Sequence, residues 1–231
     1  GVRCRGTRAG GQGLWVVADG VGGHPRGGFP IRLAVDAIIE SLEPEIADAS
    51  SGTTDADIRG KLDRAFRLAN ERIVSRRSGD PRLEKMGTTL VVAWLSGNQA
   101  HIAHIGDSRC YSLRGSQALC LTRDDTVVQN MLEDGSITRA DVPNVPFRNV
   151  LTRAVGTVEQ AGPSYRRETL DEGDVLLLCS DGLTDSVPEY RWLEIHKESD
   201  GMERTVQAMI DAGLANEAGD NVSVVLLTLE Y

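Results

Sequence analysis

Residues 16–24 read VVADGVGGH, an apolar run that leads into an aspartate and then a glycine-rich turn. Two other segments, LLLCSDG (176–182) and AGDNVSVVLL (218–227), likewise join an acid to a strongly apolar stretch. Short apolar runs bounded by Gly, Asp and Asn are typical of buried strands. We therefore expect an acid at the end of three buried strands. The acids are Asp19, Asp181 and Asp220.

The rest of the chain mixes helical and strand patterns. Apolar residues at helical spacing predict helices near 35–42 and 54–73, and further helices are expected at 126–133, 188–198 and 203–215. The stretch from 88 to 121 is rich in β-formers and broken by Gly-containing turns, which predicts a meander of antiparallel strands. The first dozen residues are basic and Gly-rich, so we expect them to be irregular. The pattern indicates an α+β fold with layered sheets and one domain over residues 1–231.

Charge and composition exclude several classes of function. The chain has 231 residues, with 25 Lys and Arg against 34 Asp and Glu, a net charge of −9. An acidic chain gains little from releasing the counterions of nucleic acid, and it is not attracted to an anionic membrane. The longest apolar run, residues 90–95, is far too short to span a bilayer. We expect no nucleic acid partner, no membrane and a monomer.

The four cysteines show no CxxC spacing. Three of them lie in or beside apolar strand-like runs, where a free thiol behaves as a small hydrophobic side chain. We therefore expect buried thiols and a reducing, cytoplasmic setting. The cysteines are Cys4, Cys110, Cys120 and Cys179.

Acids at strand ends predict a metal site if the strands converge. Any single Asp-Gly pair is more often a turn than a ligand. Three converging carboxylates, however, repel one another unless a divalent cation neutralises them. An all-oxygen ligand set favours Mg²⁺ or Mn²⁺ over zinc. Two such ions can activate a water for in-line attack on phosphorus.

The chain resembles the bacterial branch of the PP2C-type (PPM) metal-dependent Ser/Thr protein phosphatases, and the similar segments follow the family's order over nearly the whole length. These segments are VVADGVGGHPRGG (16–28), GTTLVVAWL (87–95), AHIGDSRCYSLR (103–114), LTRDDT (121–126), RNVLTRAVGT (148–157), LLLCSDGLTD (176–185) and GDNVSVVLL (219–227). The resemblance implies a β-sandwich of two antiparallel sheets flanked by pairs of α-helices. It implies metal-dependent hydrolysis of phosphoserine and phosphothreonine in proteins, with two or three Mn²⁺ or Mg²⁺ ions per chain. The implied partners are phosphoproteins made by a cognate bacterial Ser/Thr kinase.

The resemblance also implies roles for individual residues. Asp19 would bridge two metals, and Gly20 would offer a backbone carbonyl. Asp181 and Asp220 would bind one of these metals, and Asp107 would share a weaker third ion with Asp181. Asp19, Asp181 and Asp220 are thus the catalytic candidates. The stretch from about 124 to 149 would form a flap beside the substrate.

The N-terminal segment departs from the family pattern. Family members usually carry a phosphate-binding Arg followed shortly by an Asn-Glu-Asp triplet. Here Arg3 corresponds to that Arg, but no acid precedes Asp19. This departure leaves open a PP2C-like pseudophosphatase that binds phosphoproteins without turnover. A metal-dependent phosphodiesterase or nuclease is a further alternative, which the net negative charge disfavours.

Two smaller features bear on the site. Asp125 stands where family members often carry His, which places an additional negative charge near the flap. The cluster Arg72, Arg76, Arg77 and Arg82 could attract a phosphoprotein, although a solvated helix face is the simpler interpretation.

Overall fold

The structure is a computed structural model of the chain. It describes residues 2–9, 12–21, 28–47, 54–77, 86–157, 162–216, 219 and 221–229.

One sheet is built from six strands, β1 (Val2–Ala9), β2 (Gln12–Val21), β3 (Gly87–Thr88), β4 (Leu90–Ser96), β5 (Gln99–Ile105) and β8 (Ser164–Thr169). Their order is β1-β2-β4-β5-β8, with β3 paired to the end of β2. Every pairing in this sheet is antiparallel.

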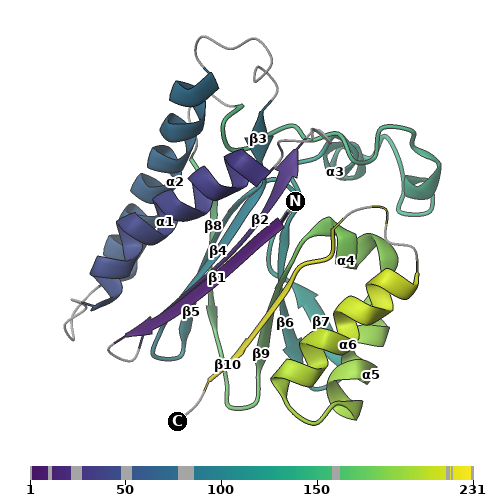
Figure 1. Cartoon of the computed structure of the whole chain (residues 1–231). Coiled ribbons are helices and arrows are strands. Elements are labelled where there is room, and N and C mark those ends of the chain that lie inside the picture. Colours follow the sequence, from purple (N-terminus) through teal and green to yellow (C-terminus); the bar gives the residue numbers. More distant parts are fainter. Residues whose placement is uncertain are drawn as a thin grey trace.

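The second sheet has four strands, β6 (Arg109–Arg114), β7 (Gln117–Cys120), β9 (Val175–Cys179) and β10 (Val224–Thr228). Their order is β10-β9-β6-β7, and all pairings are antiparallel. The two sheets lie against each other as the inner layers of a sandwich (Figure 1).

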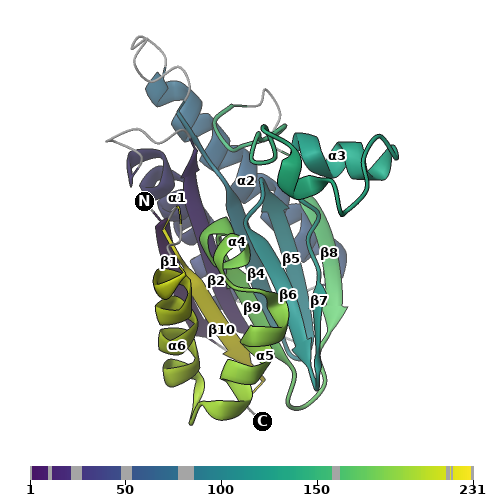
Figure 2. The same ribbon diagram turned by 90° about the vertical axis from the view of Figure 1, so that its right-hand side faces the viewer.

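Helices cover the outer faces of both sheets (Figure 2). The first sheet carries α1 (Gly28–Ala47) and α2 (Asp55–Arg77), and the second carries α5 (Glu189–Glu198) and α6 (Met202–Ala215). Three short helices, α3 (Val127–Glu133), the 3₁₀ turn η2 (Val142–Asn144) and α4 (Asp181–Ser186), lie toward one end of the sandwich. The expected β-sandwich with flanking helix pairs is confirmed.

Buried apolar side chains form three layers: between the first sheet and α1 and α2, between the two sheets, and between the second sheet and α5 and α6. Strands with a layer on each face are therefore unbroken apolar runs in the sequence. Val16 faces α1 and α2, whereas its neighbour Val17 faces the second sheet. On β9, Leu178 points between the sheets and Leu177 packs toward α5 and α6. In that outer layer Trp192 meets the ring of Tyr111 edge-on, with centroids 5.0 Å apart.

The prediction that the first dozen residues are irregular was wrong. Val2–Ala9 form β1, which pairs residue for residue with β2 from Val2↔Asp19 to Ala9↔Gln12. The segment VRCRGTRA has few apolar residues and therefore a weak local β signal, and its extended conformation follows from pairing with the strongly apolar β2.

The predicted meander over 88–121 was also wrong in its pairing. β4 pairs with β5 and β6 pairs with β7, but β5 and β6 belong to different sheets. The chain crosses from one sheet to the other at Gly106–Ser108. Gly106 has φ +102°, which L side chains rarely adopt. This crossing places Asp107 at the end of the sandwich.

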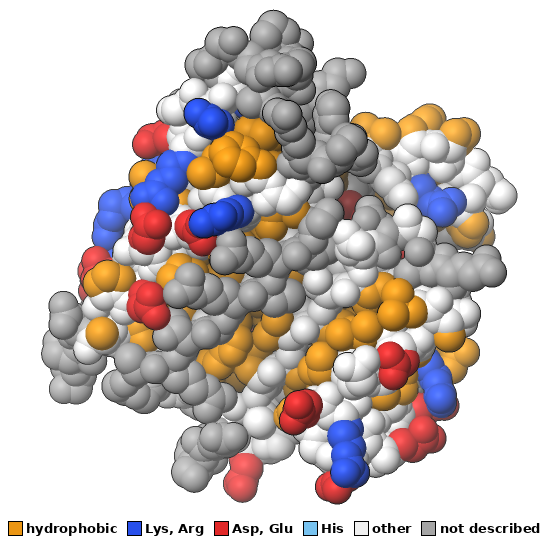
Figure 3. All heavy atoms as spheres, viewed as in Figure 1, with side chains coloured by type: hydrophobic (Ala, Val, Ile, Leu, Met, Phe, Trp, Pro, Cys, Tyr) orange, Lys and Arg blue, Asp and Glu red, His pale blue; other side chains and the backbone are white. Residues whose placement is uncertain are grey.

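The surface of α1 and α2 has mixed charges, as Figure 3 shows on one face. Arg72 pairs with Glu40 at 2.7 Å, Arg76 stacks over Phe29, and Arg77 donates to the carbonyl of Gly156. Arg82 lies outside the described residues. These contacts favour the simpler interpretation of the arginine cluster as a helix surface.

Two further expectations concern cysteines and membrane spans. The thiols of Cys110, Cys120 and Cys179 are free, and Cys120 is only half-buried. The side chain of Cys4 lies outside the described residues. Among the helices that the structure describes, none has the length and hydropathy to cross a bilayer.

Candidate metal centre

Asp19 lies buried near the end of β2, where β3 holds its backbone. Its carbonyl accepts hydrogen bonds from Thr89 N at 2.8 Å and from Thr88 Oγ1 at 2.6 Å. Its N–H donates to Thr89 Oγ1 at 3.1 Å, and its carboxylate accepts from Gly20 N at 2.7 Å. Thr88 and Thr89 therefore fix the backbone of Asp19, and the N–H of Gly20 orients its carboxylate.

A buried hydroxyl pair connects Asp19 to the turn between the sheets. Thr89 Oγ1 lies 2.6 Å from Ser108 Oγ, and both side chains are buried. The backbone N–H of Asp19 is thus hydrogen-bonded through Thr89 to Ser108, the residue that follows Asp107 in the chain.

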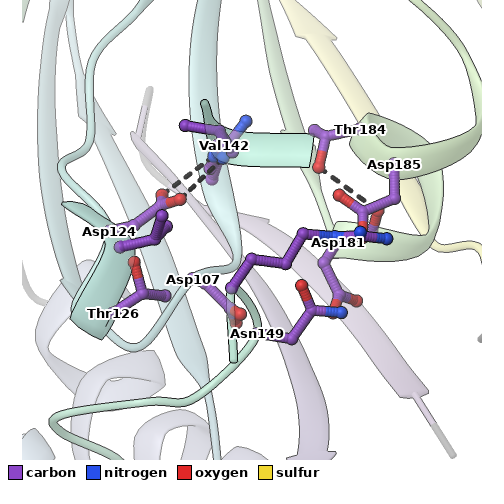
Figure 4. Close-up of a pocket in the computed structure, with 11 residues that line it drawn as sticks. Asp107, Asp124, Thr126, Val142, Asn149, Asp181, Thr184 and Asp185 are labelled. Carbon is purple, nitrogen blue, oxygen red and sulfur yellow. Dashed lines mark hydrogen bonds and ion pairs between the residues drawn. The ribbon is translucent and has the colours of Figure 1, made fainter. Parts of the chain in front are cut away.

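Asp107 and Asp181 line one small pocket at this end of the molecule (Figure 4). Its volume is about 90 Å³, enough for a few water molecules. The other lining residues are Arg109, Asp124, Thr126, Val128, Val142, Arg148, Asn149, Thr184 and Asp185. The second sheet, α4 and the segment 124–149 all contribute to the wall. Asp19 does not line this pocket.

Asp181 is positioned by a helix start rather than by a strand end. β9 ends at Cys179, Ser180 is the N-cap, and Asp181 is the first residue of α4. Thr184 Oγ1 donates to the Asp181 carbonyl at 3.2 Å. The short helix α4 was not predicted, because six residues are too few to show helical periodicity.

The segment leading into β10 lies next to Asp181. Ser180 Oγ donates to the carbonyl of Asn221 at 2.9 Å and accepts from Ser223 N at 3.1 Å. Asn221 follows Asp220 in the chain. Asp220 itself lies outside the described residues, as do His24 and the glycines at 22 and 23.

One arginine is held by an acid of the same pocket. Arg109 binds Asp124 through two hydrogen bonds, Nε to Oδ1 at 2.8 Å and Nη2 to Oδ2 at 2.6 Å. Its Nη1 also donates to Tyr111 Oη at 3.0 Å. This bidentate pair neutralises the charge of Asp124.

Burial and like charge act on Asp107. Desolvation, followed by the charges of Asp181 and Asp124, raises the pKa of the Asp107 carboxyl from 3.8 to about 7. A bound cation would relieve this repulsion, and carboxylates are the ligands that Mg²⁺ and Mn²⁺ prefer. The residues therefore fit a hard divalent cation.

The described part of the chain does not contain a complete site. Within it, no three His, Cys, Asp or Glu side chains come close enough to hold one ion together. Asp107 and Asp181 are brought together, Asp19 is linked to them through Thr89, and Asp220 cannot be placed. Arg3 lies across from Ala18 in the β1–β2 ladder, and its side chain lies outside the described residues. Val2 is the residue across from Asp19, so β1 pairs no acid with it.

The sequence did not predict Asp124, Asp185 and Arg148 as pocket residues. Asp124 and Arg148 lie in segments that carry the family resemblance, but spacing alone gives them no role. The two histidines of β5 point to opposite faces of the first sheet. His101 Nδ1 lies 2.7 Å from Tyr165 Oη on one face, and His104 Nε2 lies 2.7 Å from the Arg123 carbonyl on the other.

Comparison with known families gives one clear match. The model of the family described as Protein phosphatase 2C matches residues 4–217. The match therefore covers every helix that the structure describes and all the described strands except β10 and the start of β1.

Several named proteins are similar to this chain. The Ser/Thr protein phosphatase PstP of Mycobacterium tuberculosis is 35% identical over 213 residues, which are 92% of this chain and 40% of that protein. The Ser/Thr phosphatase stp of Listeria innocua is 32% identical over 216 residues, 94% of this chain and 84% of that protein. A crystal structure of the PstP catalytic domain in complex with two manganese ions has a TM-score of 0.80 at 31% identity, covering 97% of this chain and 96% of that one. This chain thus spans less than half the length of mycobacterial PstP.

Proposed function

Because the chain belongs to the protein phosphatase 2C family, we propose that it hydrolyses phosphoserine and phosphothreonine in proteins with the help of Mn²⁺ or Mg²⁺. The observation that carries the proposal is the pocket that Asp107 and Asp181 line together, beside the Asp19 backbone, whose N–H is hydrogen-bonded through Thr89 to Ser108. The named relatives are phosphatases, which does not favour the pseudophosphatase alternative.

The ligand roles follow the resemblance and the placement of the backbone. Asp19, the Gly20 carbonyl, Asp181 and Asp220 would hold two ions, and Asp107 with Asp181 would hold a third, weaker one. When bound, the divalent cations activate a water for direct attack on phosphorus and stabilise charge on the phosphoryl oxygens.

The chain's own residues supply position and charge balance. Thr88 and Thr89 hold the backbone of Asp19, and Gly20 N donates to its carboxylate, so this ligand is positioned in advance. Arg109 keeps Asp124 neutralised, which limits the negative charge that an incoming phosphate must face. We assign phosphate binding to Arg3. This residue lies across from Ala18 in the β1–β2 ladder, next to the pair Val2↔Asp19.

The setting of the enzyme is part of the same proposal. We propose one catalytic domain over residues 1–231, acting as a monomer on phosphoproteins made by a cognate Ser/Thr kinase. The free thiols of Cys110 and Cys179, both buried, suit a reducing compartment such as the cytoplasm.

The test is hydrolysis of p-nitrophenyl phosphate and of a phosphothreonine peptide with Mn²⁺, Mg²⁺ or EDTA. We expect turnover with Mn²⁺ that EDTA abolishes. Asp181→Asn should lower kcat at least about 100-fold, in the range reported for losing a charge-stabilising group, whereas Asp200→Asn, at an exposed acid, should not change it. Full activity of Asp181→Asn would refute the assignment.

The remaining alternatives give different results in the same assay. Tight binding of the phosphopeptide by folded protein without any turnover would identify a pseudophosphatase. Cleavage of bis-p-nitrophenyl phosphate in preference to the monoester would identify a phosphodiesterase.

A further inference from the structure

Residues 127–150, which we call the flap, leave and rejoin the molecule at one point. They contain α3 and η2 and project beyond the ends of the sheets (Figure 2). Thr126 pairs with Leu151 in an isolated bridge, and Val127 N donates to the Val150 carbonyl at 2.9 Å. We call residues 124–126 with 151–153 the flap base. Whatever holds this base sets the position of the flap.

Asp125 is the buried acid of the flap base. Its side chain is 5% exposed, and its Oδ1 accepts from Arg153 Nη1 at 3.3 Å. Its carbonyl accepts from Thr152 N at 2.8 Å, so side chain and backbone both bind the returning strand of the base. The expected negative charge near the flap is therefore buried and paired instead of facing the substrate.

The same residue also holds the turn that carries Asp107. Asp125 Oδ2 accepts from Gly106 N at 3.0 Å, and Asp125 N donates to the Gly106 carbonyl at 3.0 Å. Position 106 requires glycine, because its φ is +102° and a Cβ there would lie 2.8 Å from Thr89 Cβ. Both backbone groups of Gly106 are thus satisfied by Asp125.

The neighbouring acids Asp124 and Asp125 have different contacts. Asp124 lines the pocket and binds Arg109, whereas Asp125 is not among the lining residues. Asp125 therefore cannot act as a ligand in this pocket. Its contacts instead connect two parts of the site, the Asp107 turn and the flap base, that are otherwise separate along the chain.

We propose that Asp125 is a positioning residue that couples the order of the flap base to cation binding at Asp107. If the base opens, Gly106 loses both of its hydrogen bonds to Asp125, and the Asp107 carboxylate loses its fixed place. A cation that needs the ordered turn must in return stabilise the flap base, since coupling between two sites is reciprocal. The proposal rests on the proposed function for the assignment of Asp107 as a metal ligand.

The test compares two buried aspartates, each of which pairs with an arginine and accepts a backbone N–H. Asp174 is also 5% exposed, binds Arg114 at 2.6 Å and accepts a backbone N–H from Asp171 at 2.8 Å, but it belongs to the loop before β9 and is not a pocket residue. Asp125→Asn and Asp174→Asn therefore remove equivalent charges from different places. Hydrogen–deuterium exchange of the full chain is followed with EDTA and with Mn²⁺, and Mn²⁺ affinity is measured by isothermal titration calorimetry.

We expect Asp125→Asn to speed exchange at the amides of Thr152 in the flap base and Val127 at the start of the flap at least about tenfold, the low end for losing a charge-assisted hydrogen bond. Mn²⁺ should slow this exchange in the unsubstituted chain and in Asp174→Asn but not in Asp125→Asn. The weakest Mn²⁺ affinity should fall by a similar factor in Asp125→Asn alone. Should that variant not fold, Arg153→Gln tests the same coupling from the other side of the pair.

Two results would overturn the proposal. One is equal behaviour of the Asp125 and Asp174 variants, and the other is faster flap exchange in Asp125→Asn with unchanged Mn²⁺ affinity. Exchange and calorimetry need no substrate. A chain that binds Mn²⁺ with this coupling but lacks turnover would therefore refute the proposed reaction and leave the role of Asp125 standing.

Discussion

Asp107→Asn should stabilise the metal-free protein above neutral pH while weakening its response to metal. Asn keeps the shape of the side chain but cannot ionise. The substitution removes a carboxylate that burial and the charges of Asp181 and Asp124 disfavour.

The pKa of Asp107 gives the size of the effect. Its carboxyl has a pKa of about 7 in the folded chain against 3.8 when unperturbed. Below pH 4 it is protonated in both folded and unfolded states and costs nothing. Between pH 4 and 7 the unfolded state releases the proton first, so stability falls as pH rises and reaches a full loss of up to roughly 4 kcal/mol above pH 7.

Urea unfolding in EDTA at pH 4.5 and pH 8 measures this difference. We expect this electrostatic contribution to favour Asp107→Asn by only about 1 kcal/mol at pH 4.5 and by up to roughly 4 kcal/mol at pH 8. Adding Mn²⁺ at pH 8 should raise the stability of the unsubstituted chain more than that of the variant. Asp200→Asn is the control, because that acid is 92% exposed and its surface ion pair contributes little. A stability difference that does not change with pH would refute the electrostatic reasoning.

Three other substitutions test the scaffold of the site. Gly106→Ala should lower stability by at least about 2 kcal/mol in urea unfolding, because its Cβ would meet Thr89 and its φ is positive; unchanged stability would contradict this geometry. Thr89→Val should cost about 1–2 kcal/mol and weaken Mn²⁺ binding in calorimetry, because it breaks the hydrogen bonds to Asp19 N and Ser108, whereas Thr89→Ser should restore both. Trp192→Ala should lower stability by about 3–5 kcal/mol, because it leaves a cavity beside Tyr111. A variant that still folds should bind Mn²⁺ with unchanged affinity. A lower affinity would show that packing between the second sheet and its helices affects the metal site.

Much of the architecture could be read from local patterns. Helical spacing of apolar residues predicted α1 and α2, and the α3 prediction agrees with a helix that begins after the N-cap Thr126. The helices depend on side chains a few residues apart, which is the range over which periodicity and capping act. The sandwich and the candidates Asp19, Asp107 and Asp181 came instead from the resemblance of the ordered motifs to the PP2C family.

What the sequence left open depends on contacts between distant residues. The segment Val2–Ala9 forms β1 because β2 offers it a partner. The chain changes sheets at Gly106, although the residues on both sides of it have strand patterns. Arg109 and Asp124 are 15 residues apart, and Asp125 and Arg153 are 28 apart. Sheet partners and buried ion pairs are chosen by packing and by the cost of burying an unpaired charge, and that cost exists only once the layers have closed. The acids that we propose as metal ligands could therefore be named from the chain, whereas the residues that hold them in place became visible only in the fold.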